Sequence, residues 1–440
     1  MNLFELHEKF SESTGVSIDT RTLKKGNLFF ALQGQNTDGH QFIHQALSKG
    51  GAYVVAEKGK VSHPNKKIIL VKDVLKTLQK LANFHRRLSC DANIIAITGS
   101  NGKTTTKELI KSVLETRYDT IATEGNYNNH IGVPLTLLKL TDKTEFGIIE
   151  MGASAVGEIA SLCKIAEPDY GYITNFGKAH LEGFRNLEGV IKGKTELYQY
   201  LKRNEKYIII NQDDPIQIKH TSNYNNLYSF GVQKKDSELV CRLEEKTKKV
   251  TIFYLGIEFK TNLYGAYNFP NVGAAVNLGH ILEVPLSDIG KALYRYKPKN
   301  NRSQTLRINE VDIFLDAYNA NPDSMHAALD SFLSIDQNKS GVVLGDMLEL
   351  GAFQEKEHQN ILDRCIDSDL NFIYLVGDIF PSCQFTDPRV KTFESAQNVV
   401  GSLLKIMNQQ KIKYLLFKGS RKIALEQVVN ELKRERYTLY

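Results

Sequence analysis

The sequence lacks the features that would tie it to a membrane or to an oxidising compartment. Residues 1–10 contain no basic segment followed by an apolar run, so no signal peptide is expected. No apolar stretch reaches the ~20 residues that a membrane-spanning helix needs, so no membrane insertion is expected. The cysteines are few, scattered and without a C-x-x-C pair: Cys90, Cys163, Cys241, Cys365 and Cys383. This usage predicts reduced thiols in the cytoplasm rather than a disulfide framework or a zinc site.

The composition is that of a globular protein with several domains. A chain of 440 residues is too long for one ordinary core, and ~100–200 residues per domain predicts about two to four domains. The chain is 42% hydrophobic and 24% charged, and it has no low-complexity tract or internal repeat. Its net charge of +6 is too small to require nucleic acid, although it suits an enzyme with anionic ligands.

Hydrophobic patterns divide the chain into three α/β regions. Residues 1–88 combine short strand-like runs with helical patterns. Residues 89–301 alternate strand and helix, which predicts a parallel sheet wrapped by helices, and the stretch 239–263 predicts antiparallel strands attached to the edge of that sheet. After a polar linker at 297–301, residues 302–440 repeat the alternation and predict a second doubly wound domain.

One stretch has the order of elements that a phosphate-binding loop needs. The apolar run 94–97 predicts a strand, 107–115 has a helical pattern, and between them stand Gly99, Ser100, Asn101, Gly102, Lys103, Thr104 and Thr105. Glycines let backbone N–H groups turn towards an anion, and the N-terminus of the following helix favours negative charge. The stretch therefore predicts an ATP site, with Lys103 at the terminal phosphates and the Thr104 hydroxyl on Mg²⁺.

The motif is shorter than the strict Walker pattern. Ile97 stands where G-x-x-x-x-G-K-[ST] has its first glycine, so only G-x-x-G-K-T is present. The alternative is an ordinary glycine turn followed by a lysine. The strand before the motif and the helix after it favour the phosphate-binding interpretation.

Other polar residues follow predicted strands, and ligands bind beyond the carboxyl ends of the strands in open parallel sheets. Glu150 ends an apolar run, and one such carboxylate together with Thr104 is sufficient for Mg²⁺. His180 follows another strand, where a structural role and a functional role are equally open. Lys194 by itself is an ordinary lysine on a helix surface. The third region also has polar strand ends, which suggests a cleft that closes over the ATP.

Two kinds of polar cluster leave both a structural and a functional interpretation open. Asparagines gather at 125–132 and at 267–271, where their amides suit an adenine or an amide substrate but also suit turns. The segments 17–21 and 36–40 combine hydroxyls and carboxylates with a cation or a glycine. Taken alone, such clusters are more typical of turns and helix caps than of a ligand site.

Together, these motifs resemble the Mur ligase family, which makes bacterial cell-wall precursors. The similarity extends from Ser17 to Arg421 and rests on the phosphate loop, Glu150-Met151-Gly152-Ala153, Ala179-His180-Leu181-Glu182, Asn268 with Asn271, and Asp316-Ala317-Tyr318-Asn319-Ala320-Asn321-Pro322. The resemblance implies a small α/β uridine-nucleotide domain at 1–88, a P-loop ATPase domain with a parallel sheet at 89–301, and a Rossmann-like domain at 302–440. It also implies ATP and Mg²⁺ as cofactors.

Two segments resemble one branch of the family more narrowly. Residues 345–351 (G-D-M-L-E-L-G) and 418–421 (K-G-S-R) are similar to the member that adds D-alanyl-D-alanine to UDP-MurNAc-tripeptide. The sister enzyme that adds a diamino acid usually carries D-N-P-R, which does not occur here. The implied partners are UDP-MurNAc-tripeptide and D-alanyl-D-alanine, without nucleic acid, and the protein is expected to be a monomer.

The resemblance also implies roles for individual residues. Lys103, His180 and Lys194 would be catalytic, with Thr104 and Glu150 on one Mg²⁺ and His180 and Lys194, which is carbamylated in some relatives, on a second. Nucleotide contacts are expected from the loop residues and four others: Gly99, Ser100, Asn101, Gly102, Lys103, Thr104, Thr105, Asn268, Asn271, Arg302 and Asp316. Substrate contacts are expected near the uridine nucleotide and across the cleft: Thr20, Arg21, Asp38, His40, Asn128, Asn129, Tyr318, Asn319 and Asn321.

The leading hypothesis is therefore an ATP-dependent amide ligase of peptidoglycan synthesis that works through an acyl phosphate. One alternative is the sister ligase that adds a single amino acid, lysine or diaminopimelate. A folylpolyglutamate-type ligase fits less well, because that family lacks a uridine-binding first domain. A nucleotide-switched binding protein belongs to another class, and in such a protein Asp316, Asn319 and Asn321 would have no ligand.

Overall fold

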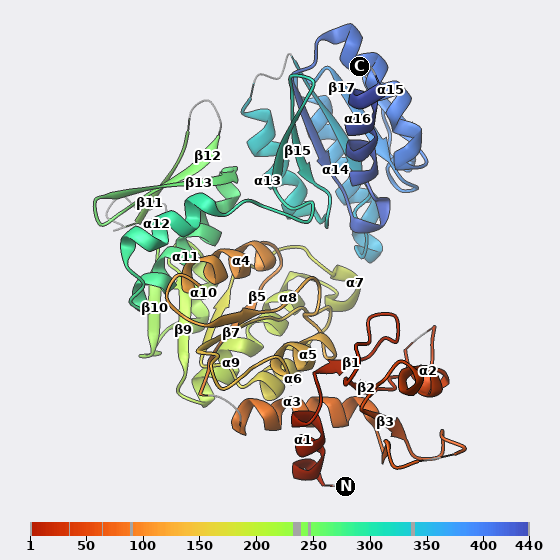
Figure 1. Ribbon diagram of the computed structural model, residues 1–440. Helices are drawn as coiled ribbons and strands as arrows, with labels where there is room; N and C mark the ends of the chain where they lie inside the picture. The colour runs from red at the N-terminus through yellow and green to blue at the C-terminus, as the bar shows by residue number, and fades with distance from the viewer. Residues whose placement is uncertain are drawn as a thin grey trace.

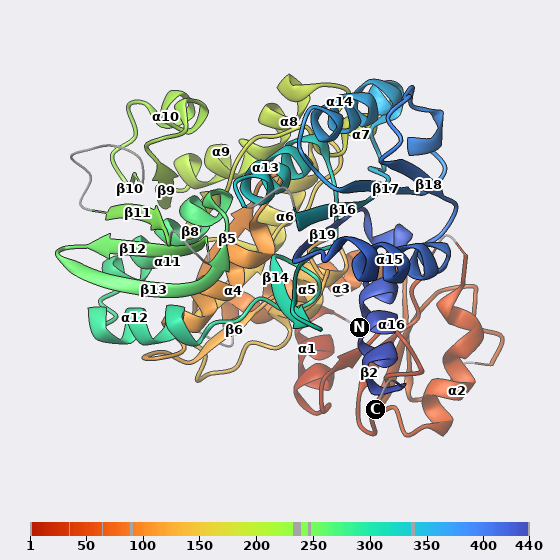
Figure 2. The same ribbon diagram turned by 90° about the horizontal axis from the view of Figure 1, so that it is seen from above.

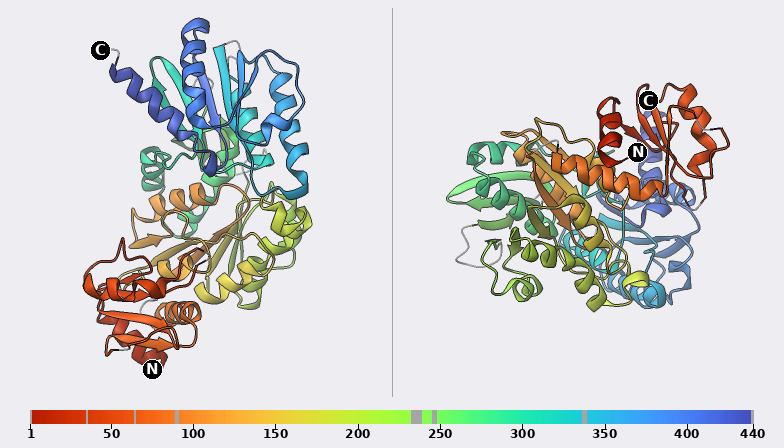
Figure 3. Two further views of the ribbon diagram at one scale, coloured as in Figure 1. Left: turned by 90° about the vertical axis from the view of Figure 1, so that its right-hand side faces the viewer. Right: turned by 90° about the horizontal axis from the view of Figure 1, so that it is seen from below.

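The computed structural model describes residues 2–34, 36–63, 65–88, 91–231, 239–244, 248–335 and 339–438. Figures 1 and 3 show three domains in a row, with the N-terminal domain at one end, the central domain in the middle and the C-terminal domain at the other end. The predicted α/β class with three domains is confirmed. Cys90 lies outside the described residues. So do Met1 and Tyr440, the first and last residues of the predicted domain ranges. None of the helices within these ranges is long and apolar enough to cross a membrane.

The N-terminal domain is built on a four-stranded parallel sheet with the order β1-β2-β3-β4. Its elements are α1 (Leu3–Ser11), β1 (Val16–Ser17), β2 (Leu28–Phe30), α2 (Ile43–Ser48), β3 (Tyr53–Glu57), β4 (Ile68–Val71) and α3 (Val74–Leu88). Helix α3 buries Leu78 and Leu81 and lies across the bottom of the central domain (Figure 3, right). It therefore joins the sheet of the N-terminal domain to the central domain.

The central domain contains a six-stranded, entirely parallel sheet with the order β10-β9-β8-β5-β7-β6. Its elements are β5 (Asn93–Thr98), α4 (Lys103–Leu114), β6 (Thr120–Ala122), α5 (Gly132–Leu137), β7 (Phe146–Glu150), α6 (Glu158–Ala166), β8 (Tyr170–Ile173), α7 (Leu181–Phe184), α8 (Leu187–Lys194), α9 (Glu196–Arg203), β9 (Tyr207–Asn211), α10 (Pro215–Thr221) and β10 (Leu227–Phe230). Strand β5 lies between β7 and β8, so the strand order reverses there. Crevices for ligands form at such reversal points, and the glycine loop leaves β5 at this point.

The antiparallel strands expected at the edge of this sheet instead form a separate sheet, so that part of the prediction was wrong. The elements are β11 (Leu239–Leu243), β12 (Lys249–Tyr254), β13 (Ile257–Tyr264), α11 (Phe269–Ile281) and α12 (Leu286–Arg295). Apolar residues such as Ile252 and Phe259 share one core with the two helices and with α4. The strands bury one face against these helices, as antiparallel strands commonly do when they form a sheet of their own. Figure 2 shows this small sheet beside α11 and α12.

The C-terminal domain has a six-stranded sheet with the order β14-β15-β19-β16-β17-β18, in which only β14 runs antiparallel to its neighbour. Its elements are β14 (Gln304–Ile308), β15 (Val311–Asp316), α13 (Pro322–Leu333), β16 (Ser340–Gly345), α14 (Gln354–Ile366), β17 (Phe372–Val376), β18 (Val390–Phe393), α15 (Ala396–Gln410), β19 (Tyr414–Lys418) and α16 (Glu426–Thr438). Neighbouring residues Val342 and Val343 belong to different cores, one with α13 and α14 and the other with α15 and α16. Both faces of the sheet are therefore covered, as in doubly wound domains.

Candidate active site between the central and C-terminal domains

The glycine loop has a backbone that only glycine adopts easily at two positions. Gly99 has φ +140°, and a Cβ there would lie 2.0 Å from the Thr174 hydroxyl oxygen. Gly102 has φ +80°, and a Cβ there would lie 2.5 Å from Asn271 Oδ1. Both glycines are thus required by close approach as well as by the left-handed backbone. Helix α4 begins directly after them, so its N-terminus faces the loop.

Lys103 lies inside the loop with its ammonium directed at backbone carbonyls. Its Nζ donates to the carbonyl oxygen of Gly99 at 2.7 Å and to that of Ser100 at 3.0 Å. Burial lowers the pKa of Lys103 to about 8, and the nearby Glu150 carboxylate opposes this shift. The carbonyl dipoles stabilise the Lys103 ammonium only in part. A phosphate bound in the loop would give it a full negative counter-charge.

Glu150 ends β7 as a fully buried carboxylate held from three sides. Its Oε2 accepts from the Thr104 hydroxyl at 2.8 Å, and its Oε1 accepts from Asn128 Nδ2 at 2.9 Å. The buried ammonium of Lys107 lies 4.0 Å from Oε2 and bonds the carbonyl of Thr123. Glu150 and Thr104 therefore lie next to each other at the cleft, as the sequence predicts, and Asn128 and Lys107 fix the carboxylate.

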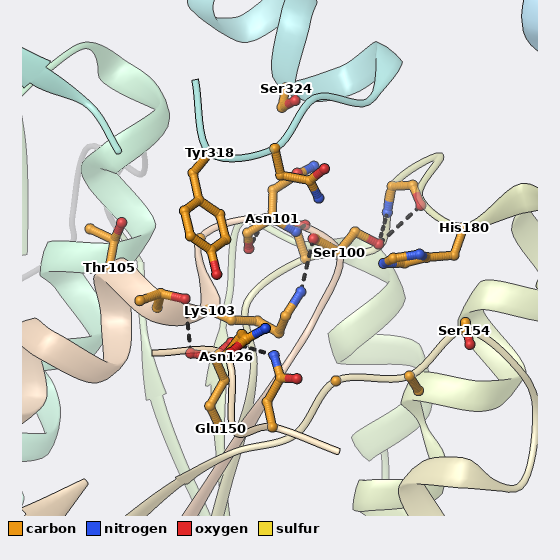
Figure 4. Close-up of a pocket in the computed structure, with 18 of the residues that line it drawn as sticks. Ser100, Asn101, Lys103, Thr105, Asn126, Glu150, Ser154, His180, Tyr318 and Ser324 are labelled. Atoms are coloured by element: carbon orange, nitrogen blue, oxygen red, sulfur yellow. Dashed lines mark hydrogen bonds between the residues drawn. The ribbon is translucent and has the colours of Figure 1, made fainter. Parts of the chain in front are cut away.

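These groups line a cavity of about 1190 Å³ between the central and C-terminal domains. Figure 4 shows Lys103, Glu150 and His180 of the central domain and Tyr318 of the C-terminal domain directed into the same space. The predicted site residues that line it are Ser100, Asn101, Gly102, Lys103, Thr104, Thr105, Asn128, Asn129, Glu150, His180, Asn268, Asn271, Arg302, Asp316, Tyr318 and Asn319. Gly99, Lys194, Asn321 and the four predicted residues of the N-terminal domain are not part of its lining.

Asn268 and Asn271 support the loop from the start of α11. Asn271 Oδ1 accepts from the Thr106 hydroxyl at 3.1 Å, and its Nδ2 donates to Asn268 Oδ1 at 2.9 Å. Asn268 Nδ2 in turn donates to the Tyr264 carbonyl at 2.7 Å. Both side chains are buried, and in the bonds named here each amide uses one of its two N–H groups, so donor capacity for a ligand is left among the described contacts.

Asn129 has a local role in addition to its place at the cavity. Its Oδ1 accepts from the backbone N–H groups of Ile131 and Gly132, at 3.0 and 2.9 Å, where α5 begins. For this residue the structure thus provides the turn chemistry that the sequence left open beside a ligand role.

The C-terminal domain contributes a buried ion pair and a stacked pair to the cavity. The ends of β15 and β19 are adjacent, and Lys418 Nζ donates to Asp316 Oδ2 at 2.7 Å. The guanidinium carbon of Arg302 lies 3.7 Å from the centre of the Tyr318 ring, within cation–π range. The sequence placed Lys418 at a polar strand end, in the K-G-S-R segment, but did not include it among the individual site residues. Its contact with Asp316 joins residues 102 positions apart, which no local pattern reveals.

His180 and Lys194, the residues expected at a second metal, are arranged differently from each other. His180 has φ +53° and bonds Glu349 of the C-terminal domain through Nδ1. Lys194 is 1% exposed, donates to the Ala153 carbonyl at 3.2 Å and lies over the Phe184 ring at 5.3 Å. Burial, followed by the charge of Lys103, lowers the pKa of Lys194 well below its usual value. Lys194 is therefore not itself part of the cavity lining, but it bonds the carbonyl of Ala153, which is.

The side chains at the cavity include ligands suited to Mg²⁺ at one position. No group of three or more His, Cys, Asp or Glu side chains suited to a metal occurs among the residues described. Mg²⁺ does not need one, because it commonly takes one or two carboxylates and completes its shell with water and phosphate oxygens. Glu150 and Thr104 fit that requirement beside the phosphate loop. Lys194 as an ammonium does not, since it has no lone pair for a metal.

In the N-terminal domain, the predicted uridine-site residues mainly bond one another and their neighbours. Thr20 donates to Gln45 Oε1 at 2.7 Å, and Arg21 forms an exposed ion pair with Asp19. Asp38 caps the turn that begins at Gly39 and bonds His40, which accepts from the Glu57 N–H at 2.9 Å. Asp38 thus has a capping role, whereas Thr20, Arg21 and His40 bond nearby side chains or backbone, and a ligand role for the four residues stays a prediction.

The G-D-M-L-E-L-G segment is largely a structural unit. The buried Asp346 carboxylate accepts from the backbone N–H groups of Asp378, Ile379 and Phe380 at 2.8–3.0 Å. The segment thereby fixes the backbone that follows β17. Its Glu349 is the residue that reaches across to His180, a contact that the sequence did not reveal.

The comparisons with known proteins agree with this architecture. Residues 12–86 match the description "Mur ligase family, catalytic domain", residues 97–279 match "Mur ligase middle domain", and residues 301–432 match "Mur ligase, glutamate ligase domain". The chain belongs to the Mur ligase family.

The similar proteins narrow this assignment to one branch. The chain is 35% identical over 95% of its length, and 93% of the other protein, to the UDP-N-acetylmuramoyl-tripeptide--D-alanyl-D-alanine ligase of Bacillus subtilis. It is 32% identical, with 95% and 93% covered, to the enzyme of that name from Escherichia coli. Among solved structures, MurF ligase from Thermotoga maritima in complex with ADP has a TM-score of 0.85 at 26% identity, covering 98% of this chain and 99% of that chain. MurF from Acinetobacter baumannii has a TM-score of 0.86 at 26% identity, with 98% of both chains covered.

Proposed function

We propose that this protein is an ATP-dependent ligase that joins D-alanyl-D-alanine to UDP-MurNAc-tripeptide in peptidoglycan precursor synthesis. The observation that carries the proposal is the similarity over 95% of the chain to ligases of that name at 35% and 32% identity. The geometry supports it, because one cavity brings the phosphate loop of the central domain together with the polar strand ends of the C-terminal domain. In a nucleotide-switched binding protein, the polar strand ends of the C-terminal domain would have no ligand.

The chemistry requires a carboxylate to be activated before an amine can attack it. A peptide carboxylate oxygen attacks the γ-phosphorus of ATP, ADP leaves, and an acyl phosphate forms. The amine of D-alanyl-D-alanine then attacks the acyl carbon and loses a proton, and phosphate leaves with the original carboxylate oxygen. Catalysis of this kind rests on positioning and on charge stabilisation.

The residues of the cavity suit these steps. Lys103, already placed at the loop carbonyls, would hold the β- and γ-phosphates. Arg302, stacked on Tyr318, and Asp316, held by Lys418, would bind the nucleotide from the opposite wall. Tyr318 and Asn319 would then face the second substrate, and Thr20, Arg21, Asp38 and His40 would bind the distant uridine nucleotide. The domain boundaries proposed for this division are 1–88, 89–301 and 302–440.

Magnesium is proposed at Thr104 and Glu150, where bound Mg²⁺ would neutralise phosphate charge. A second ion is proposed near His180, with Lys194 contributing as a carbamate. The lowered pKa of Lys194 favours the neutral amine, which is the form that reacts with CO₂. We also propose that the protein is a monomer, that it works in the cytoplasm and that it does not bind nucleic acid.

A phosphate-release assay on the purified protein tests the proposed function. ATP should yield phosphate only when UDP-MurNAc-tripeptide and D-alanyl-D-alanine are both present. Equal turnover of UDP-MurNAc-dipeptide with lysine or diaminopimelate would assign the protein to the sister branch. ATP hydrolysis that is indifferent to all these substrates would instead support a nucleotide-switched binding protein.

A further inference from the structure

The phosphate loop and the C-terminal domain are joined by a reciprocal pair of amides. Asn321 Nδ2 donates to Asn101 Oδ1 at 2.8 Å, and Asn101 Nδ2 donates back to Asn321 Oδ1 at 3.3 Å. The two residues are 220 positions apart in the chain, and Asn321 is 3% exposed. Water therefore competes little for these bonds, and losing them would leave buried amide groups unpaired.

Both members of the pair are fixed to rigid structure. The Asn101 N–H donates to Asn175 Oδ1 at 2.9 Å, and its carbonyl accepts from the Thr174 hydroxyl at 2.5 Å. On the other side, Asn321 Oδ1 caps α13 by accepting from the Ser324 N–H at 2.9 Å, in a reciprocal capping box. A shift of α13 is thus transmitted to the loop, and a shift of the loop to α13.

The segment after β8 adds further contacts between the central and C-terminal domains. The Lys178 N–H donates to Asp323 Oδ2 at 2.5 Å, and Lys178 Nζ bonds Glu357 Oε1 at 2.6 Å. Further along, the Glu182 N–H donates to the Glu349 carbonyl at 3.2 Å. This segment starts at Asn175, which also supports Asn101, so one piece of chain supports the loop and contacts α13 and α14.

We propose that Asn321 and Asn101 form a positioning pair that sets the C-terminal domain on the phosphate loop and so couples nucleotide binding to the binding of the second substrate. Tyr318 and Asn319 precede Asn321 and line the cavity, so the position of Asn321 decides where they stand. Asn321 then acts on the second substrate through the loop before it rather than by contact. This inference rests on the proposed function only for the identity of that substrate.

The variant Asn321→Ser separates the pair from the helix cap. Serine is as good an N-cap as asparagine, so the cap of α13 is kept while both amide bonds to Asn101 are lost. Asn101→Ser removes the same two bonds from the other side and leaves α13 unaltered. The matched control is Asn2→Ser, because Asn2 caps α1 in a capping box of the same kind and, within the part of the chain that the structure describes, its side chain bonds Glu5 of its own helix.

Three measurements test the proposal on the full chain: the radius of gyration with saturating ADP by small-angle X-ray scattering, the Kd of ADP by calorimetry, and the KM of D-alanyl-D-alanine. Both positioning variants should have a larger radius of gyration than the wild type. Their KM for D-alanyl-D-alanine should rise about ten-fold, as expected for losing one or two neutral hydrogen bonds. The Kd for ADP of Asn321→Ser should change less than three-fold, and Asn2→Ser should match the wild type in all three. Asn101→Ser alters a residue of the phosphate loop itself, so only its radius of gyration and KM are compared.

An unchanged radius of gyration in ADP-bound Asn321→Ser would overturn the proposal, whatever happens to the activity. A ten-fold weaker Kd for ADP with an unchanged KM would also overturn it, because the pair would then only shape the loop. If the wild type fails to ligate, the proposed function fails, but the scattering and ADP measurements still decide the role of the pair.

Discussion

The ion pair of Asp316 and Lys418 leads to an asymmetric prediction about stability. Lys418 is 1% exposed, and among the described residues its ammonium bonds Asp316 and the Asn319 carbonyl, at 2.7 and 3.3 Å. The Asp316 side chain is 21% exposed and also accepts from the Ser303 N–H at 3.2 Å. Removing the carboxylate leaves a buried ammonium without a counter-charge. Removing the ammonium leaves a carboxylate that keeps one donor and reaches the cavity.

The expected magnitudes follow from this difference in exposure. Asp316→Ala should lower the free energy of unfolding of the C-terminal domain by about 3–5 kcal/mol, the usual cost of leaving one buried charge unpaired. Lys418→Met should lower it by only about 1–2 kcal/mol, since the remaining carboxylate stays hydrogen-bonded and partly solvated. Asp316→Leu combined with Lys418→Met should recover most of the loss, because no unpaired charge then remains.

Hydrogen exchange of the β15 and β19 amides in increasing urea, followed by mass spectrometry, is the suitable assay. It resolves the C-terminal domain in a chain that need not unfold in one step. Asp312→Ala is the matched control, because Asp312 stands on the same strand in an exposed pair with Arg307 and should cost less than about 1 kcal/mol. A loss in Lys418→Met equal to or larger than that in Asp316→Ala would refute the reasoning.

Three further predictions concern stability elsewhere in the chain. Burial lowers the pKa of His85 and of the adjacent His7 below 6.5, so the unfolded state binds more protons and stability should fall as the pH drops below about 6.5. The melting temperature of His85→Gln should depend less on pH between 7.5 and 5.5 (a range of about two units), and an unchanged dependence would contradict this. Gly171→Ala places a Cβ 2.4 Å from a Leu201 methyl, so it should cost about 1–3 kcal/mol by thermal unfolding; no loss would contradict the packing. Glu196→Gln weakens the carboxylate that accepts two N–H groups at the start of α6, at 2.5 and 2.9 Å, and should cost about 0.5–2 kcal/mol, whereas a neutral effect would show that the charge is not needed.

The local part of the site could be predicted from the sequence. Gly99, Gly102 and Lys103 form a local motif between a strand and a helix, and Glu150 could be placed because an apolar strand precedes it. The close approach of Thr174 and Asn271 to the two glycines could not be predicted in this way. The fold class followed in the same way from alternating strands and helices. Turn chemistry was also anticipated correctly as one of two interpretations for Asn129.

The contacts between distant segments could not be predicted. Asn101 and Asn321 are 220 residues apart, and the partners His180 and Glu349 are 169 apart, so no pattern within one window joins them. The sheet formed by β11, β12 and β13 was misplaced for a related reason. Alternation of polar and apolar residues shows that a strand is half-buried but not which surface buries it.

The transfer of oxygen from substrate to phosphate tests the central claim most directly. UDP-MurNAc-tripeptide labelled with ¹⁸O in its terminal carboxylate is incubated with ATP, D-alanyl-D-alanine and the enzyme, and the released phosphate is analysed by mass spectrometry. An acyl-phosphate ligase must deliver one ¹⁸O to each phosphate formed with the pentapeptide product, because the carboxylate oxygen that attacks the γ-phosphorus leaves with it. Release of unlabelled phosphate with all the label retained in the peptide or its amide would contradict the account.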